Sequence, residues 1–140
     1  MTARCLLDTH IVSELARQRP DSRVESRVLA HQAECALAAP SLEELVFGVA
    51  RLPPSTRREM LERWLEGILA SFPLLPYDAR CAAWLGRERA RLAAQGQPAP
   101  RTDGEIAAVA MANGLVLVTR NRADFACYEG LLVENWFEEG

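Results

Sequence analysis

The sequence contains no lysine, so all 16 basic residues of the 140-residue chain are arginines. A phosphate-binding loop of the GxxxxGK[S/T] type is therefore excluded, and no GxGxxG motif is present either. The formal net charge is −3, so the overall balance does not indicate a basic nucleic-acid-binding protein. We interpret the exclusive use of arginine mainly as coding bias. The alternative is that guanidinium groups serve phosphate or carboxylate partners.

Long apolar segments are also missing. The longest run without an ionisable residue is Ile106 to Thr119, 14 residues, and a membrane helix needs about 18. The longest apolar run before Asp8 is the three residues Cys5, Leu6 and Leu7, so we expect no signal peptide. The four cysteines form no CxxC pair, and neither histidine lies at zinc-ligand spacing from them. We therefore expect a cytoplasmic protein with reduced cysteines, in which residues 1–140 form a single domain.

Strands and helices are predicted to alternate along the chain. The apolar segments 3–7, 35–39, 74–77, 115–119 and 131–134 are predicted strands. Helices are predicted over 9–18, 22–32, 41–52, 55–72, 78–95 and 102–113. Because the strands are apolar throughout rather than alternating, this order predicts an α/β fold with a parallel sheet covered by helices. In such sheets the ligand site lies beyond the carboxyl ends of the strands.

Aspartate is scarce, and acidic residues fall at this predicted edge. The chain has five aspartates among its 19 acidic residues. Asp8 follows the first strand, Glu44 and Asp103 lie in the first turns of two helices, and Asp124 follows the strand 115–119. Clustered carboxylates repel one another, and a divalent cation is the usual way to keep them ionised together. Ligands that are all oxygen suit Mg²⁺ or Mn²⁺.

Each of these acids also has a purely structural interpretation. Ser41 and Glu44 fit a helix-capping box, as do Thr102 and Glu105, which would leave Asp103 an ordinary first-turn acid. Asp8 can cap the helix that follows it, and Asp124 can be a turn residue. The two remaining aspartates, Asp21 and Asp78, are predicted to be helix caps.

Four segments together resemble one family. They are Leu6-Leu7-Asp8-Thr9 with Ser13-Glu14, Ser41 to Leu45 followed by Gly48, Arg101 to Ala108, and Val118 to Phe125. These segments resemble the PIN-domain ribonucleases, in particular the VapC/FitB-type toxins of bacterial type II toxin–antitoxin pairs. The resemblance implies a PIN-like three-layer domain, in which helices cover both faces of a short parallel sheet.

The resemblance also implies an activity and partners. It implies a divalent-metal-dependent endoribonuclease that hydrolyses RNA phosphodiester bonds. Asp8, Asp103 and Asp124 would hold Mg²⁺ or Mn²⁺, and Glu44 would complete the acidic pocket. Thr119 and Asn121 would hold Asp124 and the water network, although a strand end followed by a turn explains them equally well. A cognate antitoxin and a second copy of the chain, in a homodimer, are the implied protein partners.

Three other functions stay open. The first is a catalytically silent PIN-like module that binds RNA or protein, and the intact set of acids argues against it. The second is a housekeeping PIN nuclease without an antitoxin. The third is a Mg²⁺-dependent phosphatase or phosphoryl-transfer domain, but Asp8-Thr9-His10 lacks the second aspartate of a DxD nucleophile motif.

Arginines supply the candidate RNA contacts. Arg101, Arg120 and Arg122 flank the predicted acids and are the preferred phosphate contacts. Arg80, Arg87 and Arg91 share one face of the helix 78–95 with Trp84, but we favour a solvated helix face there. The apolar residues of the helix 55–72 are expected to be mostly core, and in the resembled family this half also carries antitoxin and dimer contacts.

Overall fold

The computed structural model describes residues 3–138 and contains one five-stranded sheet whose strands are all parallel. The strand order is β3-β2-β1-β4-β5. The strands are β1 (Cys5–Leu7), β2 (Cys35–Ala38), β3 (Leu74–Leu75), β4 (Val116–Val118) and β5 (Val133–Glu134). Because β1 lies at the centre, the residue that follows it emerges in the middle of the carboxyl edge. The predicted parallel sheet is confirmed.

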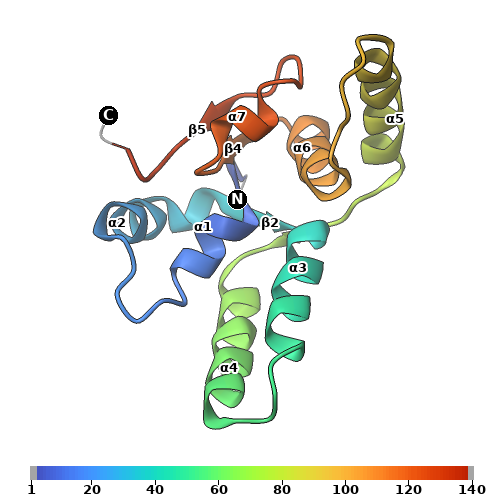
Figure 1. Cartoon of the computed structure of the whole chain (residues 1–140). Helices are drawn as coiled ribbons and strands as arrows, with labels where there is room; N and C mark the ends of the chain where they lie inside the picture. The colour runs from blue at the N-terminus through green and yellow to red at the C-terminus, as the bar shows by residue number, and fades with distance from the viewer. Residues whose placement is uncertain (1–2, 139–140) are drawn as a thin grey trace.

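Helices cover both faces of this sheet, as Figure 1 shows. They are α1 (Thr9–Glu14), α2 (Ser22–His31), α3 (Ala39–Ala50), α4 (Thr56–Ser71), α5 (Ala79–Ala94), α6 (Arg101–Asn113) and α7 (Arg122–Phe125). A 3₁₀ turn, Gln32–Glu34, precedes β2. The predicted three-layer α/β architecture is confirmed.

The strand residues alternate between two hydrophobic cores. Leu6 faces the core built with α5, α6 and Phe125 of α7. Leu7, one residue later, faces the core built with α1 and α2, which Trp136 near the end of the chain completes. Neither face of a parallel sheet is left to solvent, so both sets of side chains are apolar. This explains the unbroken apolar strands of the sequence.

The first helix is shorter than predicted, because it ends at Glu14 rather than near Gln18. The Glu14 carboxylate is buried and accepts a hydrogen bond from the backbone N–H of Asp21 at 2.8 Å. It also pairs with Arg17 at 3.3 Å. These contacts fold residues 15–21 back over the end of α1, so the chain turns before another helical turn can form. The predicted caps Asp21 and Asp78 do cap α2 and α5.

The prediction that the apolar side of residues 55–72 is mostly core is only partly confirmed, because Leu65 belongs to the core and Trp64 and Ile68 pack against it. Figure 1 shows α3 and α4 as a hairpin that extends away from the sheet. Within α4 only Leu65 is buried, whereas Met60 is 59% exposed and Leu69 is 37% exposed. Helix α4 packs mainly against α3, and Met60 and Leu69 lie on the side of the helix that neither α3 nor the core covers. No helix within residues 3–138 combines the length and the apolar character needed to cross a membrane.

Candidate active site

Asp8 is the most firmly held acid at the carboxyl edge of the sheet. It is 4% exposed and caps α1, accepting a hydrogen bond from the Thr9 backbone N–H at Oδ1, 2.8 Å away. Its other oxygen, Oδ2, accepts a hydrogen bond from the Thr119 hydroxyl at 2.8 Å. Thr119 is fully buried, and its own hydroxyl oxygen accepts from the Asn121 backbone N–H at 3.1 Å. The side chain therefore points in a fixed direction from the central strand, and its role as a helix cap is compatible with a catalytic one.

Glu44 approaches from α3 and is tied to α1. The Thr9 hydroxyl donates to Glu44 Oε1 at 2.5 Å. The alternative capping-box interpretation of this glutamate is wrong. Helix α3 begins at Ala39, so Ser41 lies inside the first turn, and its buried hydroxyl has no hydrogen-bond partner among the described residues. The bond from Thr9 ties Glu44, rather than its neighbour Glu43, to α1.

Asp103 lies in the first turn of α6. Its pKa depends on the other three predicted acids, Asp8, Glu44 and Asp124, and we call these four residues the acidic group. Burial raises the pKa of Asp103, and the negative charges of Asp8, Asp124 and Glu44 raise it further. His10 acts in the opposite direction. The four predicted acids therefore lie within electrostatic range of one another. The predicted capping box of Thr102 is absent, because α6 begins one residue earlier, at Arg101, without a side-chain cap.

Asp124 comes from the short helix α7 and is exposed. Its backbone N–H donates to the Asn121 carbonyl at 3.1 Å. Asn121 therefore supports the α7 turn through its backbone, and no side-chain bond from Asn121 to Asp124 is present in the described residues. The expected support from Thr119 goes to Asp8 instead.

The donor chemistry of these acids fits a hard divalent cation, because every candidate ligand is a carboxylate oxygen. Within residues 3–138, however, no group of three or more His, Cys, Asp or Glu side chains is arranged to hold a metal ion. Mg²⁺ usually binds proteins through one or two carboxylates and keeps several water ligands. A closed cage of protein ligands is therefore not required, and the mutual repulsion felt by Asp103 is what a cation relieves.

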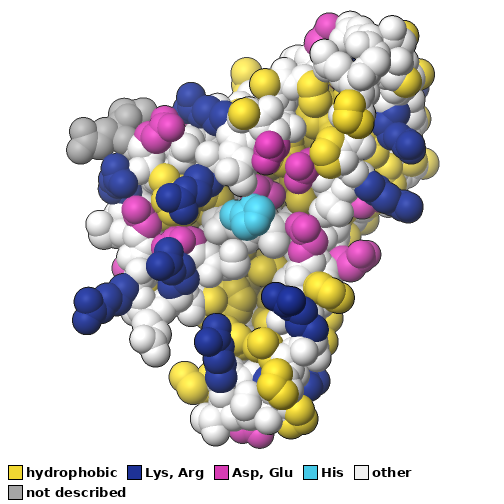
Figure 2. Space-filling view, viewed as in Figure 1, with side chains coloured by type: hydrophobic (Ala, Val, Ile, Leu, Met, Phe, Trp, Pro, Cys, Tyr) yellow, Lys and Arg dark blue, Asp and Glu magenta, His cyan; other side chains and the backbone are white. Residues whose placement is uncertain are grey.

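His10 is the residue at this site to which sequence reasoning gave no role. Its Nδ1 lies 3.8 Å from Asp8 Oδ2, and its side chain is 67% exposed. Figure 2 shows acidic side chains gathered around an exposed imidazole, with arginines further out. A signal was present in the sequence, since His10 follows Asp8 by two positions on the first turn of a short helix. His10 is not at zinc-ligand spacing from any cysteine, so that criterion gives it no role.

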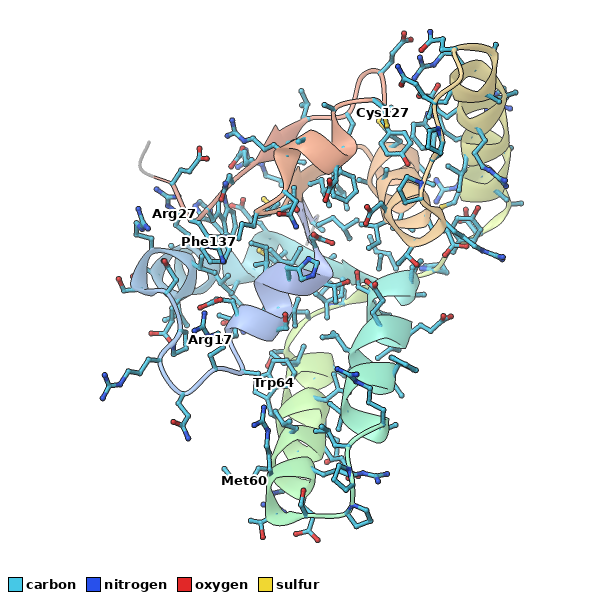
Figure 3. The ribbon with its side chains drawn as sticks, in the orientation of Figure 1. Arg17, Arg27, Met60, Trp64, Cys127 and Phe137 are labelled. Carbon is cyan, nitrogen blue, oxygen red and sulfur yellow. The ribbon has the colours of Figure 1, made fainter. Side chains whose placement is uncertain are left out.

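A groove begins at His10 and runs between α1, α3 and α4. It encloses about 660 Å³ and includes Thr9, Glu44 and Phe47 in its walls. Trp64 closes its far side and is labelled in Figure 3. The groove thus joins apolar residues of the α3–α4 hairpin, among them the exposed Phe47, to Glu44 of the acidic group.

The candidate RNA-binding arginines fall into two sets. Arg101 and Arg122 are exposed beside Asp103 and Asp124, and the guanidinium of Arg120 lies 4.3 Å from the centroid of the Phe137 ring. On α5, Arg80 donates to the Ala112 carbonyl at 3.2 Å. Arg91 donates to the Cys127 carbonyl at 2.7 Å and pairs with Glu88. These contacts favour the structural interpretation of the α5 arginines over RNA binding.

Comparison with known proteins assigns the fold to a family. The PIN domain model matches residues 5–130. The chain belongs to the PIN-domain family. The tRNA(fMet)-specific endonuclease VapC of Shigella flexneri is 34% identical to this PIN domain over 134 residues, which are 94% of this chain and 96% of the relative. Toxin FitB of Neisseria gonorrhoeae is 31% identical over 140 residues, 95% of this chain and 99% of the relative.

Solved structures give the same result. The crystal structure of FitAcB from Neisseria gonorrhoeae matches this PIN domain with a TM-score of 0.88 and 31% identity, over 96% of this chain and 99% of that one. The crystal structure of DNA-bound VapBC from Salmonella typhimurium matches with a TM-score of 0.84 and 27% identity, over 96% and 98%. The predicted resemblance to VapC/FitB-type toxins is confirmed.

Proposed function

We propose that this PIN domain is a divalent-metal-dependent endoribonuclease and the toxin of a type II toxin–antitoxin pair. The observation that carries the proposal is the set of three charges that raise the pKa of Asp103, because it links four acids from four separate segments. The names of the relatives support RNA as the substrate, since they include an endonuclease specific for tRNA(fMet) and a VapC ribonuclease. Relatives crystallised as VapBC and FitAB complexes support an antitoxin partner.

In the proposed mechanism, Asp8, Asp103 and Asp124 would hold Mg²⁺ or Mn²⁺, with Glu44 beside them. A bound ion supplies a more acidic water and neutralises charge on the phosphodiester as it is attacked. The surrounding residues of the protein orient the carboxylates. Thr119 and the Thr9 backbone fix the two oxygens of Asp8, and the Thr9 hydroxyl fixes Glu44. Rigid support of this kind keeps the reacting groups in line and lowers the entropic barrier.

Cleavage by the purified protein tests the enzymatic part. We expect single-stranded RNA to be cut in the presence of Mg²⁺ or Mn²⁺ and left intact in EDTA, with activity restored by excess metal. Gel analysis of an end-labelled RNA reads this out. Cleavage that persists in EDTA would contradict the metal requirement, and intact RNA under every metal condition would favour the catalytically silent module.

Expression in a bacterial host tests the toxin assignment. We expect induction of the wild-type chain to stop growth, and co-expression of the antitoxin encoded next to it to restore growth. The variant Asp8→Asn, which removes one carboxylate of the acidic group, is expected to be harmless at equal protein level. An active enzyme that leaves growth unaffected would indicate a housekeeping nuclease. Co-purification with the antitoxin, and the mass of the toxin alone, report on the proposed complex and homodimer.

A further inference from the structure

A second hollow lies beside the acidic group, on the opposite side of His10 from the groove between α3 and α4. It encloses about 300 Å³, the lower end of the size range of ligand pockets. Its walls come from α1, the turn after β4 and the end of the chain. The lining residues are His10, Ser13, Glu14, Arg17, Arg120, Asn121 and Phe137. The hollow therefore combines two guanidinium groups and an imidazole with an aromatic ring and with the carboxylate of Glu14, which pairs with Arg17.

Each of the two guanidinium groups contacts another side chain of the hollow. Arg120 lies over the face of Phe137, with 4.3 Å between its guanidinium carbon and the ring centroid. Arg17 pairs with Glu14, whose carboxylate is buried and fixed by the Asp21 backbone N–H. Figure 3 labels Arg17 and Phe137, which come from opposite ends of the chain and both lie close to α1. The contact with Phe137 restrains Arg120, which lowers the side-chain entropy that binding of an anion costs there.

The hollow shares its inner wall with the candidate active site. His10 lines it and lies 3.8 Å from Asp8, and Asn121 lines it while its backbone N–H bonds to Thr119. A ligand in this hollow is therefore adjacent to the acids at which we place the cleavage reaction.

Positive charge continues from the hollow along the surface. Arg17 also lines a neighbouring depression of about 720 Å³, together with Arg19 and Arg57. A row of cations of this kind follows the repeating phosphates of a polyanion better than it follows a single small anion. Figure 2 shows arginines on this side of the acidic side chains.

We propose that this hollow binds one nucleotide of the RNA strand, next to the bond that is cut. The inference rests on the proposed ribonuclease function. Single-stranded nucleic acid is bound by cations that contact the phosphates and by flat groups on which bases stack. The hollow offers both, because Arg120 stacked on Phe137 and the imidazole of His10 present planar faces. An acidic peptide would use the cations and leave these planar faces without a role.

Proton NMR provides a direct test, because the chain has only two histidines. A short single-stranded RNA, added without metal to the full-length protein, is expected to shift the ring resonances of both His10 and Phe137, because Phe137 lines this hollow and not the groove between α3 and α4. His31 is the internal control, since it packs against Trp136 and does not line the hollow. An acidic peptide of equal charge serves as the competing ligand. Shifts with the peptide and none with RNA would overturn the proposal and indicate a protein-docking site.

Substitution of Arg120 tests the contribution to affinity. Arg120→Ala in the Asp103→Asn background, which keeps the RNA intact, is expected to weaken RNA binding about tenfold, as loss of one stacking and phosphate contact implies. Arg63→Ala is the matched control, because Arg63 is exposed on α4 and does not line the hollow. Equal affinity of the two variants would overturn the proposal. If the two variants bind RNA equally well and the wild-type protein still cleaves RNA, the proposed function stands and only the nucleotide site is refuted. If the wild-type protein does not cleave RNA, the proposed function itself is refuted.

Discussion

Asp103→Asn is expected to lower metal-dependent RNA cleavage by about 10²- to 10³-fold and, at the same time, to stabilise the metal-free fold. The loss of activity follows because a metal ligand supplies several kcal/mol of transition-state stabilisation, and each 1.4 kcal/mol is about tenfold in rate. The gain in stability follows from the raised pKa of Asp103, which is due to burial and to the charges of Asp8, Asp124 and Glu44. Asparagine removes this charge and keeps the shape of the side chain.

The stability difference between Asp103→Asn and the wild type is also expected to depend on pH. The folded-state pKa of Asp103 lies above its unfolded value, so the folded protein holds this proton to higher pH than the unfolded chain. The charge of Asp103 therefore costs stability as the pH rises from the ordinary carboxyl range through the raised pKa. The stability advantage of Asp103→Asn should be largest at neutral pH and disappear as the pH falls to about 4, near the ordinary value.

Thermal unfolding with and without metal measures both effects. In EDTA at neutral pH the variant should unfold at a higher temperature than the wild type. Mg²⁺ or Mn²⁺ should stabilise the wild type and reverse the order, because a ligand stabilises only the state that binds it. Asp21→Asn is the control, since Asp21 caps α2 away from the site and asparagine caps equally well. A destabilised, fully active Asp103→Asn protein would remove Asp103 from the proposed site.

Thr119→Val is expected to cost about 1–3 kcal/mol of unfolding free energy and to lower cleavage at least about tenfold. The side chain is fully buried, donates to Asp8 Oδ2 at 2.8 Å and accepts from the Asn121 N–H at 3.1 Å. Valine fills the same space but leaves the N–H without this acceptor. It also frees Asp8 from its fixed orientation, so activity should fall beyond what the loss of stability explains.

The matched control for this position is Thr119→Ser, which keeps the hydroxyl and removes only a methyl group. We expect the serine variant to retain most of the activity, with a modest loss of stability from the small cavity. Urea unfolding gives the free energies, and kcat/KM for a defined RNA gives the activity under conditions where both variants are folded. If serine and valine were equally impaired, the methyl group and its packing would be the important part of Thr119.

Local patterns in the sequence predict the sheet and its acidic edge well. The strands are short apolar runs, and a carboxylate that directly follows one of them, such as Asp8, has to emerge at the carboxyl edge. The hydroxyl groups that orient these acids could not be predicted in this way. Thr9 meets Glu44 across 35 positions and Thr119 meets Asp8 across 111, and no local pattern reports a contact between such distant segments.

The exposed side of α4 escaped prediction for a related reason. Apolar residues at helical spacing indicate a covered face, but the pattern does not say whether the protein itself or a partner covers it. Met60 and Leu69 are apolar at core spacing and yet exposed, because α4 rests on α3 and extends beyond the sheet. The helix ends were displaced in a similar way. At Glu14, a buried carboxylate and its backbone partner outweigh the helical propensity of the residues that follow.

The central position of β1 also determines when the acidic group can assemble during folding. Strand β1 pairs with β4, so residues 5–7 lie beside residues 116–118, and Asp8 meets its hydroxyl partner only at position 119. Contacts between such distant segments form late, because a long loop has to close first. The hydrogen bond that orients Asp8 therefore forms only once the chain has folded through position 119, and Asp124 of the same acidic group lies five residues further along. A chain in which residues 116–124 have not yet folded, such as a partly made one, therefore has no assembled acidic group.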